Sequence, residues 1–428
     1  MTVKRNAALG FIFITILIDV IGFGIIIPVL PALIKQLTGG DITVAAKYGS
    51  WLTFAYAIMM FISSPFIGAL SDRYGRRPIL LFALAGLGID YLFQAFSPTI
   101  TLLFIGRLIA GITGASFTTA SAYIADISAP EKRAQNFGMV GVAFGLGFII
   151  GPAIGGFCSE IGKHMGHTGM FDWTVRLPFI VAAVFSLLNV LYGFFVLPES
   201  LLPENRRKFD IKRANPIGTL KQLKKYKILI GLSGSYFLLN LGAHALQSNW
   251  AYYTMYKFNW SSLTVGLSLS VVGLLVAAVQ GGLIRVTIPW LGEKNSVFTG
   301  LSFYVAGMIL FAFASQGWMM FVFLIPYCLG GIGGPAMGGI MANEVPNNEQ
   351  GELQGALSSL TSITAFLGPL LMNNLFAWFT GDKAPFRFPG MPFIAGAVCG
   401  LLAILFAIPS LSHYHKRKQA EKAETSEA

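Results

Sequence analysis

The sequence has little charge for its length. Only 11% of its 428 residues are charged, whereas an ordinary soluble domain has about 25%. Apolar residues make up 54% of the chain. A soluble protein of this size needs a polar surface that these residues do not provide, and the same hydrophobicity excludes intrinsic disorder. The composition therefore predicts an integral membrane protein.

The sequence also lacks the motifs of most enzymes. Cys158, Cys328 and Cys399 lie in or beside apolar stretches, without the spacing of a disulfide framework or a metal site. No Gly-x-x-x-x-Gly-Lys loop is present to bind nucleotide phosphates, and no Ser/His/Asp or Cys/His set has a supporting context. We therefore expect no enzyme activity, no bound metal and no cofactor.

Long apolar stretches, in contrast, are abundant. A helix needs about 20 apolar residues to cross a bilayer, and twelve stretches reach this length. They are residues 8–33, 48–70, 78–97, 100–124, 135–158, 177–197, 227–250, 263–286, 296–315, 318–341, 353–378 and 391–410. They predict an all-α membrane protein with twelve transmembrane helices in two six-helix bundles.

Lysine and arginine are unevenly distributed across the predicted membrane. With both termini in the cytoplasm, 22 of the 30 lie in cytoplasmic segments, seven lie on the opposite side, and Arg107 lies inside the fourth span. Cytoplasmic loops of membrane proteins carry such an excess. We therefore expect both termini in the cytoplasm, and the net charge of +11 requires no nucleic-acid partner.

A polar stretch from Pro198 to Lys225 separates six spans from six. It predicts a cytoplasmic linker, residues 198–226, between one bundle at residues 1–197 and a second at residues 227–412. A cytoplasmic tail, residues 413–428, follows the second bundle.

An internal repeat supports this division. Gly138 and Gly151-Pro152 in the fifth span recur 217 residues later as Gly355 and Gly368-Pro369 in the eleventh. Weak internal symmetry of this kind is typical of transporters whose two halves rock about a central binding site.

The loop between the second and third spans reads Gly-Ala-Leu-Ser-Asp-Arg-Tyr-Gly-Arg-Arg-Pro over residues 68–78. Gly68 allows helices to approach closely, Gly75 permits a tight turn, and Asp72 is placed to bond neighbouring helix ends. This spacing resembles the signature loop of the major facilitator superfamily. The resemblance covers nearly the whole chain and implies the fold of that superfamily.

Two further motifs carry the same resemblance. Arg107-x-x-x-Gly111 in the fourth span is similar to another motif of this superfamily. The fifth span contains the spacing Gly-x-x-x-Gly-Pro-x-x-Gly-Gly, which is similar to the motif of the proton-coupled antiporters of the superfamily. The residues of this spacing are Gly147, Gly151, Pro152, Gly155 and Gly156.

Within the superfamily, the chain resembles the tetracycline efflux proteins at residues 17–31, 88–91, 312–318, 330–336 and 351–355. The resemblance implies a proton-coupled antiporter in a bacterial inner membrane. Such an antiporter exports a small amphipathic, tetracycline-like drug, in the case of tetracyclines as a divalent-metal chelate, and the proton is its coupling ion.

The chain departs from those exporters in its second half. Tyr304 stands where they carry an acidic residue in the ninth span, and Val276 stands where they carry a histidine in the eighth. The glutamine that follows is kept as Gln280. The sequence therefore leaves the identity of the drug open.

Three ionisable residues, Asp19, Asp90 and Arg107, lie within predicted spans. Each costs about 2.5–3.5 kcal/mol on insertion scales and is by default a functional candidate. At about 1.5 Å per residue, all three lie roughly 20 Å from the cytoplasmic side, so pairing between them is possible. We predict that they act in proton coupling, with Asp19 as the first choice, and structural ion pairing is the alternative.

We also predict a conformational latch at the cytoplasmic ends of spans two to five. Its members are Gly68, Asp72, Arg73, Gly75, Arg76, Arg77, Asp126, Glu131 and Arg133. The alternative is a set of separate surface ion pairs, each contributing less than about 1 kcal/mol.

Polar residues of the seventh and eighth spans predict a substrate cavity. They are Asn240, His244, Gln247 and Gln280. His244 and Gln247 are about one turn apart and share a helix face, where they could form hydrogen bonds with a polar aromatic ligand. Bonding between neighbouring helices is the alternative for each of them.

Two other functions remain open on the same fold. One is a facilitator or importer of a small metabolite in which the membrane carboxylates are structural, and the other is a non-transporting sensor. The expected partners are a small-molecule substrate, protons and the lipid bilayer, and we expect a monomer.

Overall fold

The computed structural model describes residues 2–114, 116–128, 133–168, 171–206, 227–346 and 350–427. Almost all of these residues are helical. Within the described residues the one sheet is an antiparallel pair of two-residue strands, β1 (His167–Thr168) and β2 (Phe171–Asp172). Packing divides the chain into two units, one formed by residues 1–214 with 251–274 and the other by residues 215–250 with 275–428.

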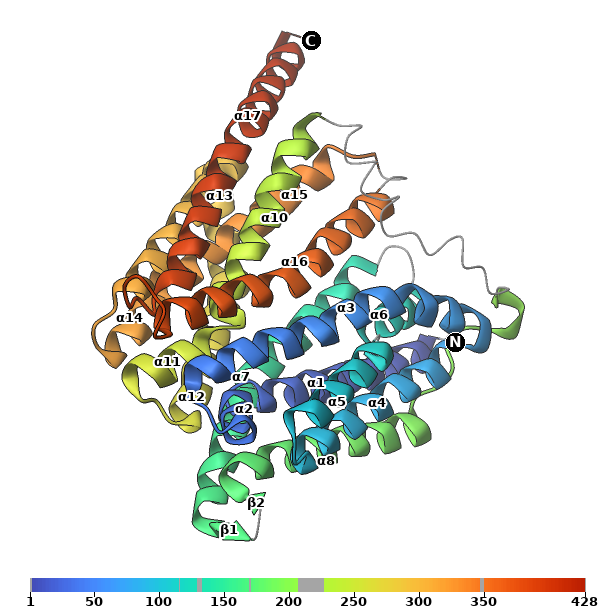
Figure 1. Ribbon diagram of the computed structural model, residues 1–428. Helices are drawn as coiled ribbons and strands as arrows, with labels where there is room; N and C mark the ends of the chain where they lie inside the picture. The colour runs from blue at the N-terminus through green and yellow to red at the C-terminus, as the bar shows by residue number, and fades with distance from the viewer. Residues whose placement is uncertain are drawn as a thin grey trace. The chain divides into compact units, whose positions relative to one another are not determined.

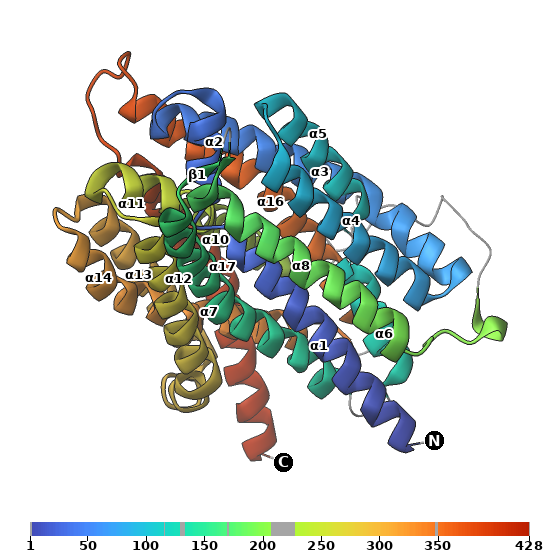
Figure 2. The same ribbon diagram turned by 90° about the horizontal axis from the view of Figure 1, so that it is seen from below.

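The first unit holds helices α1 to α8, drawn from blue to green in Figure 1, with α11 and most of α12. Its elements are α1 (Thr2–Ile26), α2 (Leu30–Thr38), α3 (Ile42–Tyr74), α4 (Arg76–Phe96), α5 (Ile100–Thr113), α6 (Ser116–Ile127), α7 (Arg133–Met165), α8 (Trp173–Val196), the 3-10 turn η2 (Pro203–Asn205), α11 (Trp250–Phe258) and α12 (Ser262–Ala278). Helices α1, α7 and α8 pack side by side, as Figure 2 shows.

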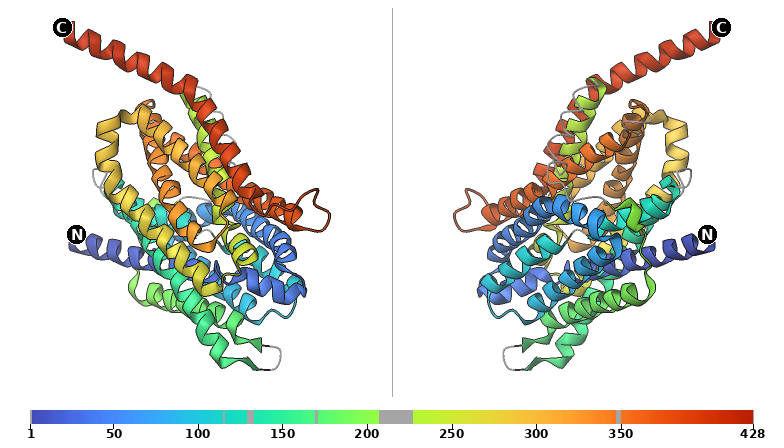
Figure 3. Two further views of the ribbon diagram at one scale, coloured as in Figure 1. Left: turned by 90° about the vertical axis from the view of Figure 1, so that its left-hand side faces the viewer. Right: turned by 90° about the vertical axis from the view of Figure 1, so that its right-hand side faces the viewer.

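The second unit begins with α10 and ends with the longest helix. Its elements are α10 (Lys227–Gln247), the π-helical turn η5 (Val279–Leu283), α13 (Ile284–Phe313), α14 (Gly317–Leu329), the 3-10 turn η6 (Gly330–Ile332), α15 (Gly333–Asn343), α16 (Gln350–Thr380) and α17 (Met391–Glu427). The last turns of α17 extend past the other helices of this unit (Figure 3).

Eleven helical runs among the described residues are long and apolar enough to cross a membrane. The predicted number is twelve, and the difference arises at one place. Ser262–Phe313 forms a single run of 52 residues, which takes in the predicted spans 263–286 and 296–315. Its backbone breaks between them at Gly292, where φ is 77°. Each predicted span therefore overlaps a helical run, and the all-α membrane fold is confirmed.

The offset of 217 residues applies far beyond the glycines that revealed it. It carries α4 onto residues 293–313, which is the part of α13 after the break. It carries α5 onto α14, α6 onto α15 and α7 onto α16 within a few residues. It also carries Gly75, with φ of 107°, onto Gly292. The two halves of the chain thus repeat one helical plan.

Each unit has its own apolar core. In the first unit, Ile12 and Ile16 of α1 pack with Leu80 and Leu84 of α4, and all four side chains are buried. In the second unit, a corresponding cluster joins α10, α13, α15, α16 and α17. Burial of these apolar faces holds the helices in place. Other faces of the same helices carry the polar groups described next.

Helix α4 is also held by a buried arginine at its C-terminal end. Nη1 of Arg176, from α8, donates hydrogen bonds to the carbonyl oxygens of Gln94, Ala95 and Ser97 at 3.2, 3.1 and 2.8 Å. A cation at this end complements the helix dipole and pairs with carbonyls that have no partner inside the helix. Arg176 therefore fixes α8 to the end of α4.

Candidate functional site

A buried ion pair joins α4 to α5. Nη2 of Arg107 lies 2.5 Å from Oδ2 of Asp90, and Gln94 donates to the same oxygen at 2.8 Å. Asp90 is 1% exposed and Arg107 is 7% exposed. Gly106 of α5 packs closely against α4, where an added Cβ would lie 3.0 Å from Cβ of Phe93 and 3.4 Å from Oδ1 of Asp90. Because both charges are desolvated, removing either one leaves an uncompensated charge.

The pair is not saturated with hydrogen bonds. Oδ1 of Asp90 and Nε of Arg107 are buried without a hydrogen-bond partner among the described residues. The guanidinium of Arg107 also lies 5.5 Å from the ring centre of Tyr56 on α3. The free oxygen and the free N–H give the pair capacity for an additional partner.

Asp19 lies in the same unit but has a different environment. Its Oδ2 accepts a hydrogen bond from the hydroxyl of Ser116 on α6 at 2.9 Å, and it is 6% exposed. In the part of the chain that the structure describes, no cation forms an ion pair with it. A serine hydroxyl donates to a carboxylate and accepts from a carboxylic acid. This contact therefore suits both protonation states of Asp19.

Tyr91 of α4 packs against the helix that carries Asp19. Its ring packs against Gly22, one turn from Asp19 on α1, where a Cβ would lie 3.3 Å from the ring. It lies on α4 beside Asp90 and is 2% exposed. The predicted coupling residues therefore belong to one buried region, in which Arg107 pairs with Asp90 and not with Asp19.

Arg76 is the centre of the predicted latch. Its guanidinium lies 2.5 Å from Oδ1 of Asp72 and 3.0 Å from Oδ2 of Asp126. The residue is buried, with 9% of its surface exposed. Gly75 precedes it with φ of 107°, a conformation that other residues rarely adopt. The glycine turn thus places Arg76 between the ends of α3 and α6.

A linker residue completes this turn. Oε1 and Oε2 of Glu199 accept hydrogen bonds from the backbone N–H groups of Arg76 and Arg77 at 2.8 and 3.3 Å. Ser200 donates to Oδ2 of Asp126 at 3.1 Å. An anion at a helix N-terminus satisfies its free N–H groups and its dipole. Glu199 therefore connects the start of α4 to the segment that follows α8.

The other arginines of the loop are less enclosed. Arg73 is exposed, and its guanidinium lies 5.1 Å from the ring centre of Tyr74. Arg77 donates to the carbonyl oxygen of Phe194 and lies 5.7 Å from the ring centre of the same residue. Arg77 thus contacts α8, whereas Arg73 stays on the surface of its own helix.

One expected contact is not found. Among the described residues nothing lies within 4 Å of the position that a Cβ on Gly68 would take. Within the first unit, therefore, no helix approaches closely at Gly68, and its place in the latch stays a prediction. Glu131 lies outside the described residues. Arg133 begins α7, but its side chain also lies outside the part that the structure describes.

The glycines of the antiporter-like motif bring α7 onto α1. A Cβ on Gly147 would meet Val20, and one on Gly151 would lie 2.8 Å from Cα of Gly24. A Cβ on Gly155 would meet the backbone of α1 again, one turn further on. The motif therefore permits backbone contact along the helix that carries Asp19.

The same helix also contacts α12 inside the first unit. A Cβ on Gly156 would lie 2.8 Å from Cα of Leu263. Ser270 donates to the carbonyl oxygen of Ile149 at 2.6 Å, and Pro152 lies against Gly266. These contacts explain why residues 251–274 group with the first unit.

The predicted cavity residues lie in the second unit. Asn240 donates to a carbonyl oxygen of its own helix at 2.8 Å, and His244 packs against Gly368 of α16. Gln247 is exposed at the end of α10, and Gln280 is exposed on the π-helical turn η5. No hydrogen bond joins Gln280 to the three α10 residues within the described chain. Single π-helical turns occur frequently at functional sites.

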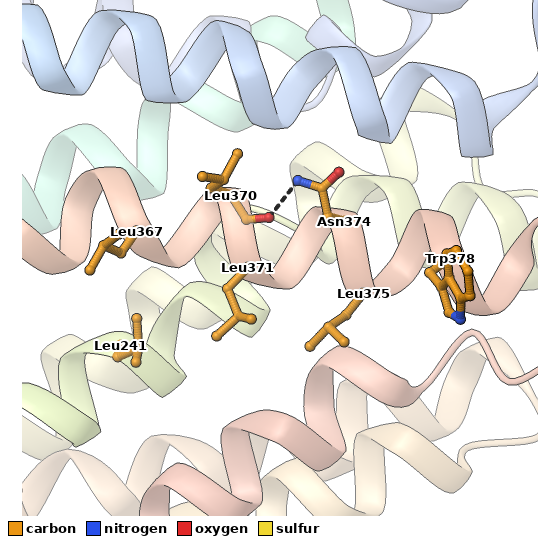
Figure 4. A pocket seen from close by; sticks show the side chains of 7 residues that line it. All are labelled: Leu241, Leu367, Leu370, Leu371, Asn374, Leu375 and Trp378. Carbon is orange, nitrogen blue, oxygen red and sulfur yellow. Dashed lines mark hydrogen bonds between the residues drawn. The ribbon is translucent and has the colours of Figure 1, made fainter.

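A groove of about 580 Å³ lies between α10 and α16. Its lining residues are Leu241, Leu367, Leu370, Leu371, Asn374, Leu375 and Trp378. Figure 4 shows the amide of Asn374 turned back to the carbonyl oxygen of Leu370, which it bonds at 2.6 Å. The groove is thus an apolar surface with one amide.

Tyr304 is enclosed by glycines of three elements. It is 4% exposed, and its hydroxyl has no hydrogen-bond partner among the described residues. A Cβ on Gly242, Gly330 or Gly400 would clash with it. Val276 is half-buried on α12. Both side chains are neutral, so neither supplies the titratable group that stands there in the exporters.

Several partners in these sites were not predicted from the sequence. Gln94 follows Asp90 by four residues on one helix, and this spacing could have indicated it. Ser116 is 97 residues from Asp19, and Glu199 was grouped only with the polar linker. No local pattern links such distant positions, so only the fold identifies them.

The sequence matches the family described as the Major Facilitator Superfamily over residues 12–369 and 232–427. It is 37% identical to the class C tetracycline resistance protein of Escherichia coli over 401 residues, covering 94% of this chain and 96% of that one. It is 34% identical to the class H tetracycline resistance protein of Pasteurella multocida over 426 residues, covering 98% of each.

A solved structure shows the same fold. The structure of a D-xylose-proton symporter superposes with a TM-score of 0.72 and 17% identity, covering 95% of this chain and 97% of that one. The chain belongs to the Major Facilitator Superfamily and, within it, to the family of the tetracycline resistance proteins.

Proposed function

We propose that the chain is a proton-coupled antiporter that exports a tetracycline-like drug. The observation that carries the proposal is the pair of buried carboxylates in the first unit. Asp90 is paired with Arg107, whereas Asp19 is held by a hydroxyl alone. Such a contrast provides one group with a fixed charge and one that is able to gain and lose a proton.

In this proposal Asp19 binds the incoming proton. Ser116 holds it in both protonation states, and Arg107 exchanges between the two carboxylates as the bundles move. The moving bodies are the bundles at residues 1–197 and 227–412, joined by the linker. The loop centred on Arg76 is the latch that breaks and reforms between the two end states.

The drug is bound by neutral groups of the second unit. His244, Gln247, Gln280 and Asn240 supply hydrogen bonds, and the groove along α16 takes the apolar face. We propose that transport requires no cofactor and that the drug is carried as a divalent-metal chelate. We propose a monomer in the bacterial inner membrane, with both termini in the cytoplasm.

Uptake of tetracycline into inverted membrane vesicles tests the proposal. With Mg²⁺ and an acidic vesicle interior, we expect the parent chain to concentrate tetracycline and release protons, and an ionophore to abolish both. Asp19→Asn is the matched variant. Uptake that ignores the pH gradient would instead identify a facilitator, and no uptake across a panel of drugs would exclude drug export.

A further inference from the structure

The second unit has a polar cluster at the turn that repeats the latch loop. Gly292 has φ of 77°, and Glu293 follows it. One carboxylate oxygen of Glu293 accepts a hydrogen bond from Nδ2 of Asn343 at 3.3 Å. The other accepts one from the hydroxyl of Tyr414 at 2.6 Å. A single carboxylate therefore connects α13, α15 and α17.

A second contact lies beside the first. Nη1 and Nη2 of Arg417 lie 2.8 and 2.5 Å from the two carboxylate oxygens of Glu344. The side chain of Glu344 is only 3% exposed, whereas that of Arg417 is 46% exposed. A fork of two charge-assisted bonds on a buried carboxylate fixes direction as well as distance. Arg417 thus ties α17 to the end of α15.

Both contacts rest on the apolar core of the unit. The ring of Tyr414 is 3% exposed and belongs to the cluster that includes Val297 of α13 and Met341 of α15. A polar contact on top of a packed core is more persistent than an isolated surface pair, because its groups are already ordered.

The offset of 217 residues makes this cluster the sequence equivalent of the latch in the first unit. Arg76 corresponds to Glu293, Asp126 to Asn343, and Ser200 to Arg417. In each unit the residue after the glycine turn bonds the end of a neighbouring helix. A side chain from a later segment joins this contact, since Ser200 bonds Asp126 in the first unit and Tyr414 of α17 bonds Glu293 in the second. The charge at the turn is reversed, so the common feature is the three-way connection.

We propose that Tyr414 and Arg417 form a clasp that keeps α13, α15 and α17 together as one body while the transporter changes conformation. The inference rests on the proposed transport function. Both are positioning residues, since they lie at the predicted cytoplasmic end and contact neither the coupling carboxylates nor the groove. A weakened clasp slows the conformational change without altering drug binding.

The test compares the full-length parent with Arg417→Glu, Glu344→Arg and the double exchange in proteoliposomes. Normalised to folded protein, each single variant is expected to lower the maximal transport rate roughly tenfold with an unchanged KM for tetracycline, and the double exchange to restore most of it. Arg387→Glu is the matched control, because its pair with Asp382 is exposed, and it should transport like the parent.

Three results would overturn the clasp: parental rates in both single variants, a double exchange as slow as the singles, or a loss confined to KM. Tyr414→Phe removes one hydroxyl and keeps the packing, so it decides the matter if the charge variants do not fold. It should transport a few times more slowly, and a parental rate would contradict the proposal.

A parent that transports no drug would contradict the proposed function alone. The clasp is then judged by hydrogen exchange over residues 338–346 and 411–417. Arg417→Glu is expected to speed exchange in both segments, because losing the fork frees both helix ends. Unchanged exchange would exclude the clasp whether or not the chain exports tetracycline.

Discussion

The two halves of the chain share one helical plan but differ in where they keep charge. Asp19, Asp90 and Arg107 are all in the first half, and the residues 217 positions later are Tyr236, Gly307 and Leu324. The helices α14 and α16 contain no Asp, Glu, Lys or Arg apart from Glu352 near the start of α16. The same helical plan thus carries buried ionisable residues in one half and neutral residues at the equivalent positions in the other.

This difference shows that the repeat conserves packing and not chemistry. Glycine turns and helix contacts recur at the same offset, whereas the titratable groups do not. A charge buried in a membrane helix is costly, so it persists in the half where it has partners. In the second half, where tyrosine and glycine occupy the equivalent positions, no such partners are required.

The largest effect is expected from removing the one buried cation of the coupling region. Arg107→Ala leaves Asp90 buried without its partner, which should lower the free energy of unfolding by about 3–5 kcal/mol and abolish transport. Thermal unfolding in detergent measures the loss. Lys163→Ala, which breaks an exposed pair with Glu160, is the control and should cost less than about 1 kcal/mol. Equal losses would show that the Asp90 pair is not structurally special.

A different loss is expected at Asp19. Asp19→Asn is neutral at every pH, so uphill uptake driven by a pH gradient should disappear while exchange of drug for drug persists. Tyr236→Phe, at the equivalent place in the second half, removes the hydroxyl that lies 3.3 Å from Thr361. It should keep the dependence on the gradient. If Asp19→Asn still concentrates drug as the parent does, the assignment of coupling to Asp19 is wrong.

The smallest effect compares the two glycine turns. Gly292→Ala should cost about 1–3 kcal/mol, the strain of an ordinary residue at this positive φ and extended ψ, since nothing lies within 4 Å of the added Cβ. Gly75→Ala carries the same strain, and its Cβ also meets the carboxylate of Glu199. It should therefore cost about 1 kcal/mol more through the lost cap. Equal shifts in the unfolding midpoint would show that the Glu199 cap does not stabilise the turn.

Most of the fold follows from hydropathy and charge in the sequence. Each apolar stretch of sufficient length is helical, because backbone groups in a bilayer must bond within their own segment. Hydropathy does not reveal whether two spans are joined without a loop. Residues 262–313 form one run because the turn at Gly292 needs only one residue of unusual backbone conformation.

The sequence indicated which ionisable residues lie within the membrane spans, but not which of them form an ion pair. Counting residues along spans places Asp19, Asp90 and Arg107 at similar depth, yet depth gives no rotation of one helix about its axis. The pairing of Arg107 with Asp90 follows the close packing of α5 on α4, where Gly106 lies beside Phe93. Such a contact depends on tertiary packing, and a single sequence contains no signal for it.

Helix α4 is secured at both ends by side chains of opposite charge, Glu199 at its start and Arg176 at its finish. The position and rotation of this helix are therefore fixed at two points. Because Asp90 lies between these points, we expect its surroundings to change through movement of α5 and Arg107 and not of α4. A substitution of Glu199 or Arg176 would thus increase the mobility of α4 without changing a residue that contacts the drug or the proton.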